Sequence, residues 1–260
     1  MTQSQAPTIA VVFAGGKGTR LTNQTQPKQF VEVGGKPIIA WTLQLFESSP
    51  EIDAIYVVSI DSHLDPMKEL IAQHGFRKVK KVVAGGDYAM ESIFIGLELA
   101  LSDNQPEDAI VLIHDGVRPI INGELIERIV QSVANHGNAV TSRPAYETLA
   151  ASKDEGNTVS TVTERSEMFT LQAPQAFRLG PIHKAHLLGK QERIHDKVVD
   201  QAHLISLLQE EKIDRTLAPL RLVEGLVGNI KITTTDDINY FEFLLQSGKY
   251  KQLTQDPKDS

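Results

Sequence analysis

The segment Ile9-Ala-Val-Val-Phe13 continues directly into Ala14-Gly-Gly-Lys-Gly-Thr-Arg-Leu21. The first five residues are apolar and rich in valine and isoleucine, which predicts a buried strand. The glycines that follow would let backbone N–H groups approach an anion closely. In open α/β sheets, ligands bind at the carboxyl ends of the parallel strands. This stretch therefore predicts the first strand of an α/β sheet, followed by a phosphate-binding turn.

Two named phosphate-binding motifs do not match this turn. It lacks the pattern G-x-x-x-x-G-K-[ST], and Gly16-Lys17-Gly18 lacks the third glycine of G-x-G-x-x-G. Neither a P-loop ATPase nor a Rossmann dehydrogenase is therefore supported. A purely structural glycine turn is the alternative, but the cations Arg20 and Lys28 close behind it favour phosphate binding.

Short β-branched runs recur along the first half of the chain, with amphipathic segments between most of them. Two of these segments, 64–74 and 122–136, are followed by a glycine, which is typical of a helix C-terminus. The alternation predicts an α/β fold with a mainly parallel sheet and helices on both of its faces. The runs that predict strands are residues 9–13, 54–60, 79–83, 109–113 and 139–142.

The chain changes character after Arg143. Residues 144–162 are polar and contain the turn-forming sequence Asp154-Glu-Gly-Asn157. This composition predicts a β-arm that projects from the sheet, with a plain surface loop as the alternative.

The C-terminal part should return to the sheet. Two helices are expected first, then strands at residues 217–223 and 230–233, and then a last helix. Thr234 and Asp237 have the spacing of a capping box at the start of that helix. Its predicted apolar stripe consists of Ile238, Phe241 and Leu245.

The composition restricts the function classes. The chain has 260 residues, 41% of them hydrophobic, a formal net charge of −7 and no cysteine. We expect one domain over residues 1–250 and a polar, frayed tail over 251–260. The missing cysteines exclude disulfides, thiolate metal sites and a cysteine nucleophile, and the acidic charge disfavours a nucleic-acid partner. The polar N-terminus and the lack of a long apolar run predict a cytoplasmic protein without a membrane partner.

Lys28 is a candidate for catalysis. It lies in Pro27-Lys-Gln-Phe30, at a spacing that would let a loop return it to the phosphates bound by the glycine turn. Together with Arg20 it would offset the charge of a phosphoryl-transfer transition state. A solvated surface lysine is the alternative.

The segment His114-Asp-Gly-Val-Arg-Pro119 follows the predicted strand at 109–113. Asp115 should therefore emerge at the same edge of the sheet as the glycine turn, where it could hold Mg²⁺ between nucleotide phosphates. Arg118 could accept an anionic co-substrate. The alternative is an Asp–Arg pair that caps a turn, and His114 is expected to be structural.

Gly85-Gly-Asp-Tyr-Ala-Met-Glu-Ser92 predicts a second glycine turn between a strand and a helix. Asp87 and Ser92 could read the edge of a base there. They could equally serve as helix caps, which is common for these residue types.

Together these segments resemble one family, the CTP-dependent cytidylyltransferases of sugar-alcohol phosphates. The family includes the methylerythritol-phosphate enzyme of isoprenoid synthesis and the ribitol-phosphate enzyme of wall and capsule synthesis. Pro-Lys-Gln-Phe combined with His-Asp-x-x-Arg-Pro distinguishes it from other sugar nucleotidyltransferases. The resemblance covers residues 9–245 and rests on residues 14–20, 27–30, 34–38, 85–86, 92–93, 114–119 and 229–233.

The resemblance implies a modified Rossmann-like nucleotidyltransferase fold. It implies transfer of CMP from CTP to a polyol phosphate, with Mg²⁺ and release of pyrophosphate. In this family the arm reaches across a homodimer, so residues 144–162 are expected to form the dimerisation element.

The resemblance also implies a role for each matching residue. Catalytic positions, which would stabilise charge around the transferred group, are Arg20, Lys28 and Lys231. Nucleotide-binding positions are Ala14, Gly15, Gly16 and Gly18 for the triphosphate and ribose, Gly86, Asp87 and Ser92 for cytosine, and Asp115 for ribose or metal. Acceptor-binding positions are Arg118, Thr148 and Arg165.

The choice of acceptor rests on smaller features. Ala14-Gly15-Gly16 is more similar to the pentitol-phosphate branch than to the isoprenoid branch, so D-ribitol 5-phosphate or a related polyol phosphate is favoured over methylerythritol phosphate. Ala89 stands where many relatives have arginine, and Gly228 where a polar or acidic residue is common. These two departures suggest, as an alternative of another class, a nucleotide-binding homologue without catalysis.

Overall fold

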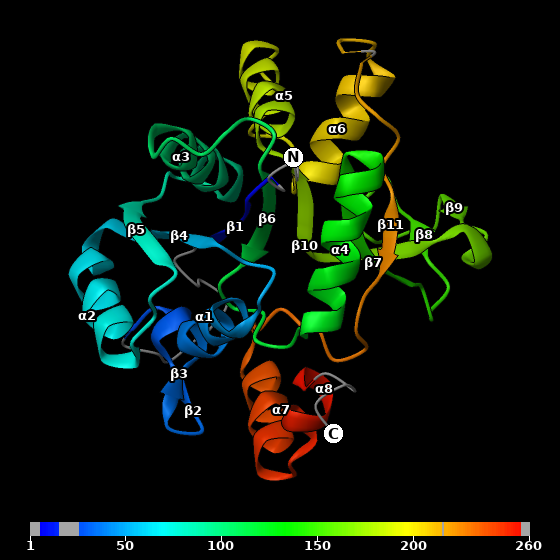
Figure 1. The fold of residues 1–260 in the computed structure, drawn as a ribbon. Coiled ribbons are helices and arrows are strands. Elements are labelled where there is room, and N and C mark those ends of the chain that lie inside the picture. Colours follow the sequence, from blue (N-terminus) through cyan, green and yellow to red (C-terminus); the bar gives the residue numbers. More distant parts are fainter. Residues whose placement is uncertain (1–5, 16–25, 215, 256–260) are drawn as a thin grey trace.

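The computed structural model describes residues 6–15, 26–214 and 216–255. The strands of its central sheet are β1 (Thr8–Ala14), β4 (Ala54–Ser59), β5 (Val79–Ala84), β6 (Ile110–Asp115), β7 (Asn138–Pro144), β10 (Phe169–Arg178) and β11 (Leu222–Glu224). Their order is β11-β7-β10-β6-β1-β4-β5 (Figure 1). Among these described strands only β10 runs antiparallel to its neighbours, β6 and β7. The predicted mainly parallel sheet is confirmed.

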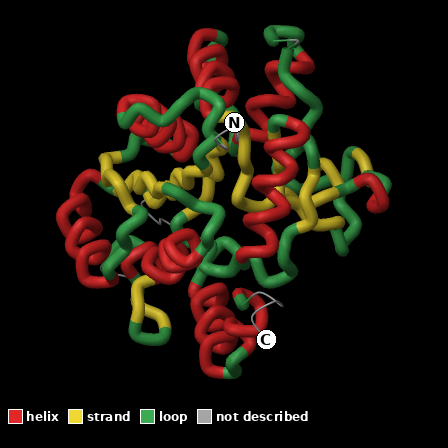
Figure 2. The backbone as a smooth tube through the Cα atoms, viewed as in Figure 1, coloured by secondary structure: helices red, strands yellow, loops and turns green. Residues whose placement is uncertain are grey.

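Helices cover both faces of this sheet, as predicted (Figure 2). The helices are α1 (Ile38–Ser48), α2 (Leu64–His74), α3 (Ala89–Ser102), α4 (Gly123–His136), α5 (Leu179–Gln191), α6 (Gln201–Glu210), α7 (Thr235–Gln246) and α8 (Lys249–Thr254). In β1, Ala10 and Val12 belong to the buried cluster of α1, α2 and α4, whereas Ile9 and Val11 belong to that of α3 and α5. This alternation follows from the two-residue period of a strand, and it explains why β1 is apolar on both sides.

Local signals fixed the ends of several helices. Helices α2 and α4 are closed by the glycines expected there, Gly75 and Gly137, which have left-handed φ angles of 68° and 83°. The capping box of Thr234 and Asp237 is present at the start of α7. These predictions are confirmed.

Three expectations for the C-terminal part are wrong in detail. The strand expected at 217–223 is the three-residue strand β11, displaced toward its C-terminal end. Residues 230–233 form no strand, because the Ile232 N–H donates to the Val117 carbonyl while the Ile230 N–H donates to the nearby Gly228 carbonyl, so no ladder with a neighbouring strand continues. Helix α8 continues to Thr254, so the first residues of the expected frayed tail are helical.

The segment after β7 forms the predicted arm. Strands β8 (Ala150–Ala151) and β9 (Thr161–Val162) pair in an antiparallel sheet of their own, beside the main sheet (Figure 1). The Asp154 carboxylate closes the turn between them by accepting hydrogen bonds from the Ser152 hydroxyl and the Thr158 N–H. A second small sheet, β2 (Glu32–Val33) with β3 (Lys36–Pro37), precedes α1.

No helix within the described ranges combines the length and apolar composition needed to cross a bilayer.

Candidate active site

A cavity of about 320 Å³ opens at the carboxyl ends of β1 and β6, beside the turn that follows β5. This is the edge of the sheet at which open α/β folds bind ligands. The residues singled out from the sequence that line it are Ala14, Gly15, Lys28, Gly86, Asp87, Ser92, Asp115 and Lys231. Positions far apart in the sequence therefore meet at one place.

Gly15, at the end of β1, and the glycine turn after β5 both approach Ser92, which is buried in the first turn of α3. A Cβ on Gly15 would lie 2.9 Å from the Ser92 Oγ, and a Cβ on Gly85 would lie 2.6 Å from it. The same Oγ accepts a hydrogen bond of 3.1 Å from the Gly86 N–H. A side chain at Gly15 or at Gly85 would therefore crowd the same hydroxyl, which lies between the ends of β1 and β5.

Lys28 is brought to the cavity by its neighbour Gln29. The segment 28–30 forms a single 3₁₀ turn, and the Gln29 Nε2 donates a 2.5 Å hydrogen bond to the Ala14 carbonyl at the end of β1. Gln29 is 1% exposed. The Pro-Lys-Gln-Phe motif alone does not indicate this role, since the partner of Gln29 lies in a different element.

Asp115 ends β6 between two cations. Its Oδ1 lies 2.5 Å from the Lys231 Nζ, and its Oδ2 accepts a 3.0 Å hydrogen bond from the Arg118 Nε. Burial alone would raise the pKa of this carboxyl, but the adjacent Lys231 and Arg118 hold that pKa below its usual value. Asp115 is therefore an ionised group that orients both cations at the cavity.

His114 precedes Asp115 but faces the interior. Its Nε2 lies 3.0 Å from the Arg118 carbonyl oxygen, and its ring packs edge-on against Phe46. Burial lowers the pKa of His114 to about 4, so the ring is neutral and donates to that carbonyl. The expectation of a structural histidine agrees with this geometry.

A second cavity, of about 200 Å³, adjoins the first. Arg118 lines it, and Asp115 and Lys231 line both cavities. The Arg118 Nη1 donates to the Asn229 carbonyl, and the Asn229 Nδ2 donates a 2.6 Å hydrogen bond to the Ala173 carbonyl. Asn229 therefore fastens the loop that carries Lys231 to β10, although no role was assigned to it from the sequence.

The donor set limits how a metal could be held. Within the described ranges no group of three or more histidine or carboxylate side chains could bind a metal ion. Mg²⁺ is commonly bound by one or two carboxylates together with substrate phosphates. Asp115 fits such a site, because it lines both cavities and each carboxylate oxygen has a second lone pair beyond those facing Lys231 and Arg118.

Thr148 and Arg165 lie elsewhere, Thr148 on the arm and Arg165 at its base, just after β9. Both are exposed, and neither lines the two cavities of this site. The Arg165 Nη1 lies 3.4 Å from the Tyr146 carbonyl oxygen. Within one copy of the chain these residues are not brought to the cavity. Gly16, Gly18 and Arg20 lie outside the described residues.

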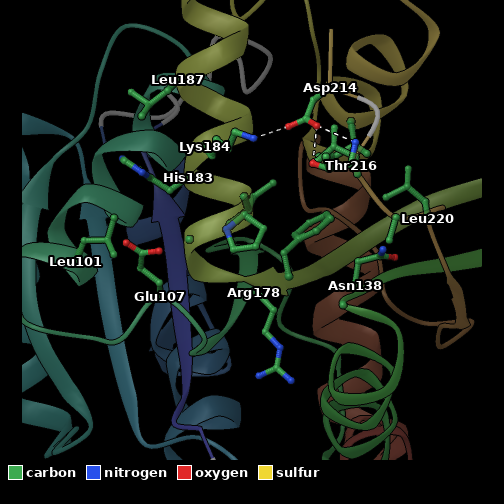
Figure 3. A pocket seen from close by; sticks show the side chains of 18 residues that line it. Leu101, Glu107, Asn138, Arg178, His183, Lys184, Leu187, Asp214, Thr216 and Leu220 are labelled. Carbon is green, nitrogen blue, oxygen red and sulfur yellow. Dashed lines mark hydrogen bonds and ion pairs between the residues drawn. The ribbon is translucent and has the colours of Figure 1, made fainter. Parts of the chain in front are cut away.

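A larger cavity, of about 530 Å³, lies at the opposite edge of the sheet (Figure 3). Arg178 at the end of β10 and Asn138 at the start of β7 line it. Two of its charged groups, Lys184 and Asp214, form an ion pair with each other. None of the site residues expected from the sequence lines this cavity.

Known proteins resemble this chain over nearly its whole length. Residues 8–247 match the family model described as IspD, 2-C-methyl-D-erythritol 4-phosphate cytidylyltransferase. A ribitol-5-phosphate cytidylyltransferase of Streptococcus agalactiae is 42% identical over 94% of this chain and 98% of its own length. A 2-C-methyl-D-erythritol 4-phosphate cytidylyltransferase of Clostridium acetobutylicum is 33% identical over 91% and 96%. The crystal structure of 4-diphosphocytidyl-2C-methyl-D-erythritol synthase from Anaerococcus prevotii superimposes with a TM-score of 0.76, at 28% identity, and covers 93% of this chain and 96% of that one.

Proposed function

The chain belongs to the IspD family of cytidylyltransferases, and from this premise we propose that it transfers CMP from CTP to D-ribitol 5-phosphate. The products would be CDP-ribitol and pyrophosphate, for wall or capsule polymers. The higher identity to the ribitol-phosphate enzyme than to the methylerythritol-phosphate enzyme supports this acceptor. The observation that carries the assignment is the cavity at the carboxyl edge of the sheet, which Lys28 and Lys231 line together with Gly15 and Gly86.

The reaction needs no nucleophile from the protein. An oxygen of the acceptor phosphate attacks the α-phosphorus of CTP, and the bond from that phosphorus to the pyrophosphate oxygen breaks. Negative charge accumulates on the α-phosphate oxygens during this exchange, so two preorganised cations lower the barrier. Lys28 and Lys231, which both line the cavity, would supply them, and Asp115, which pairs with Lys231, would keep it oriented until the triphosphate binds.

Mg²⁺ would be held by Asp115 and by oxygens of the triphosphate. When bound it would neutralise phosphate charge and favour departure of pyrophosphate. The backbone N–H groups of the Gly15 and Gly86 turns would bind the nucleotide from the protein side.

We include a homodimer in the proposal, with Thr148 and Arg165 completing the acceptor site of the neighbouring subunit. The arm and its base carry exposed apolar side chains, which is typical of an interaction surface. They are Tyr146 (64% exposed), Val159 (66%), Val162 (60%) and Phe169 (43%). The proposed compartment is the cytoplasm, where CTP is available.

The first experiment is pyrophosphate release by the purified protein with CTP and Mg²⁺, with D-ribitol 5-phosphate and methylerythritol 4-phosphate as parallel acceptors. The proposal expects a higher kcat/KM with ribitol phosphate. A preference for methylerythritol phosphate would place the enzyme in the isoprenoid branch. CTP binding without turnover of either acceptor would support the homologue without catalysis.

A further inference from the structure

A chain of hydrogen bonds leads from the wall of the nucleotide cavity into the protein. The Tyr88 hydroxyl lies 3.1 Å from the His195 Nδ1, and the His195 Nε2 lies 2.8 Å from the His186 Nδ1. Tyr88 lines the 320 Å³ cavity and is 37% exposed, whereas both histidines are buried. The residues come from the start of α3, from α5 and from the segment after α5.

The positions of the protons follow from the end of this chain. The His186 Nε2 is buried and has no hydrogen-bond partner. A proton there would leave a buried N–H unsatisfied, which is rare in proteins. His186 therefore carries its proton on Nδ1 and donates to the His195 Nε2. A neutral His195 then carries its proton on Nδ1 and donates to the Tyr88 oxygen.

This order leaves the Tyr88 hydroxyl with a hydrogen to donate. Its oxygen already accepts from His195, and its own O–H has no acceptor among the described residues. Burial lowers the pKa of both histidines, and the nearby Lys190 charge lowers it further. Burial raises the pKa of Tyr88, and the nearby Glu91 charge raises it further. Glu91 and Asp196 oppose the shift at His195 without reversing it. The hydrogen-bond directions from His186 to His195 and from His195 to Tyr88 require neutral imidazole rings and a protonated phenol.

Neighbouring groups hold the histidines in place. Phe94 stacks on His186 with ring centroids 6.0 Å apart and meets His195 edge-on at 6.2 Å. The Lys190 ammonium lies over the Phe94 ring, 4.0 Å from its centroid. The orientation of His195, and through it that of the phenol, is therefore fixed by packing.

We propose that Tyr88 binds the nucleotide by donating a hydrogen bond from its hydroxyl, and that His195, supported by His186, is a positioning residue for that hydroxyl. The inference rests on the proposed function, since it requires CTP in the cavity that Tyr88 lines. It adds a binding residue at a position that neither sequence motifs nor family roles had singled out.

Calorimetric titration with CTP and Mg²⁺, together with steady-state kinetics, tests the proposal. Tyr88→Phe keeps the ring and removes the donor, so we expect the Kd and the KM for CTP to rise roughly three- to tenfold. The kcat and the KM for the acceptor should remain near the wild-type values. His195→Ala should raise the same two constants, and His195→Asn, whose amide can replace the Nδ1 donor, should restore part of the loss.

The double variant separates positioning from a general structural effect. If His195 acts through the Tyr88 hydroxyl, Tyr88→Phe combined with His195→Ala should bind CTP no more weakly than the weaker of the two single variants. Tyr56→Phe is the matched control. It loses hydroxyl bonds to Asp103 and Gln105 in a residue that does not line the cavity, and it should leave the CTP constants unchanged.

Wild-type affinity in Tyr88→Phe would overturn the inference, and so would additive effects in the double variant. Calorimetry with CTP alone needs no acceptor, so its result is independent of the proposed acceptor. Weaker CTP binding by Tyr88→Phe, in a protein that turns over neither polyol phosphate, would support the inference and refute the assigned reaction. If the wild-type protein does not bind CTP, both fail.

Discussion

Asp115 and Lys231 form an ion pair of 2.5 Å, although one ends the central strand β6 and the other lies in the loop before α7. The Asp115 side chain is 10% exposed and that of Lys231 is 39% exposed. The lysine is thus anchored by a buried carboxylate and still reaches the cavity. A substrate phosphate could replace Asp115 as the partner of the Lys231 ammonium without unfolding the loop, because Asp115 would keep Arg118 as its own partner.

Replacing this lysine should affect catalysis more than stability. Lys231→Ala leaves the Asp115 charge paired with Arg118, and we expect kcat to fall by roughly 10²–10³ because one preorganised cation is lost. Lys184→Ala is the matched control, since Lys184 pairs at 2.8 Å with Asp214 at the opposite edge of the sheet. It should change the melting temperature but not kcat. Equal losses of kcat in the two variants would contradict the role given to Lys231.

Lys28→Ala should lower turnover by roughly 10² or more, because Lys28 and Lys231 are the cations that line the cavity in the described part of the chain. Initial rates of pyrophosphate release at saturating CTP measure the effect. Lys68→Ala provides the comparison, since Lys68 is an exposed lysine paired with Asp65 on α2 and should be neutral. Turnover in Lys28→Ala close to that of the wild type would refute the assignment.

Gly15→Ala should destabilise the protein through contact with one hydroxyl. The added Cβ would lie 2.9 Å from the Ser92 Oγ, which is too close for an unstrained contact. Ser92→Ala removes that oxygen at the cost of leaving the Gly86 N–H without its acceptor, about 1–3 kcal/mol. The double variant should therefore lose less stability than the two single losses combined, as measured by denaturant unfolding. Strict additivity would show that the turn relaxes away from Ser92.

The features predicted from the sequence are those encoded by neighbouring residues. The glycines after α2 and α4 and the capping box of α7 are local signals, and the helices end or begin there. The apolar run of β1 and the glycine turn after it placed the cavity at the correct edge of the sheet. Carboxyl ends of parallel strands always meet at one edge, so this step needed only the fold class.

The features that were missed depend on distant partners. Residues 230–233 alternate like a strand, but the Ile232 N–H donates its backbone hydrogen bond to the Val117 carbonyl, and the Ile232 side chain packs in the cluster that contains Ile38 and Phe241. Gln29 is recognisable as a support for Lys28 only through its bond to the Ala14 carbonyl. The link from Tyr88 to His195 joins α3 to the segment after α5, and no spacing rule relates those positions.

Acid should destabilise the folded state through His114. Burial lowers its pKa from 6.5 to about 4, so between these pH values the unfolded chain binds a proton that the folded protein does not. The free energy of unfolding should fall as the pH is lowered through this window, by up to about 3 kcal/mol for this residue. His186 and His195 shift in the same direction and add to the slope.

Chemical denaturation at several pH values between 4 and 7 measures this slope. His114→Gln keeps an N–H for the Arg118 carbonyl but has no titrating ring, so its slope should be shallower than that of the wild type. A slope as steep as that of the wild type would assign the acid sensitivity to other groups.

Mixing two inactive variants should restore activity if the arm completes the neighbouring site. Arg165→Ala alters the base of the arm and leaves the cavity intact, whereas Lys28→Ala alters the cavity and leaves the arm and its base intact. In a mixed dimer one site would combine an intact cavity with an intact arm. Random exchange of subunits would then restore roughly a quarter of wild-type turnover, because half of the dimers are mixed and each has one complete site of two. Turnover that stays at the level of the separate variants, with subunit exchange verified, would mean that Arg165 acts within its own subunit or not at all.

Val162→Asp, which places a charge on the exposed apolar face of β9, should shift the protein toward monomers in sedimentation and lower turnover in parallel. A monomeric but fully active Val162→Asp protein would separate the arm from catalysis.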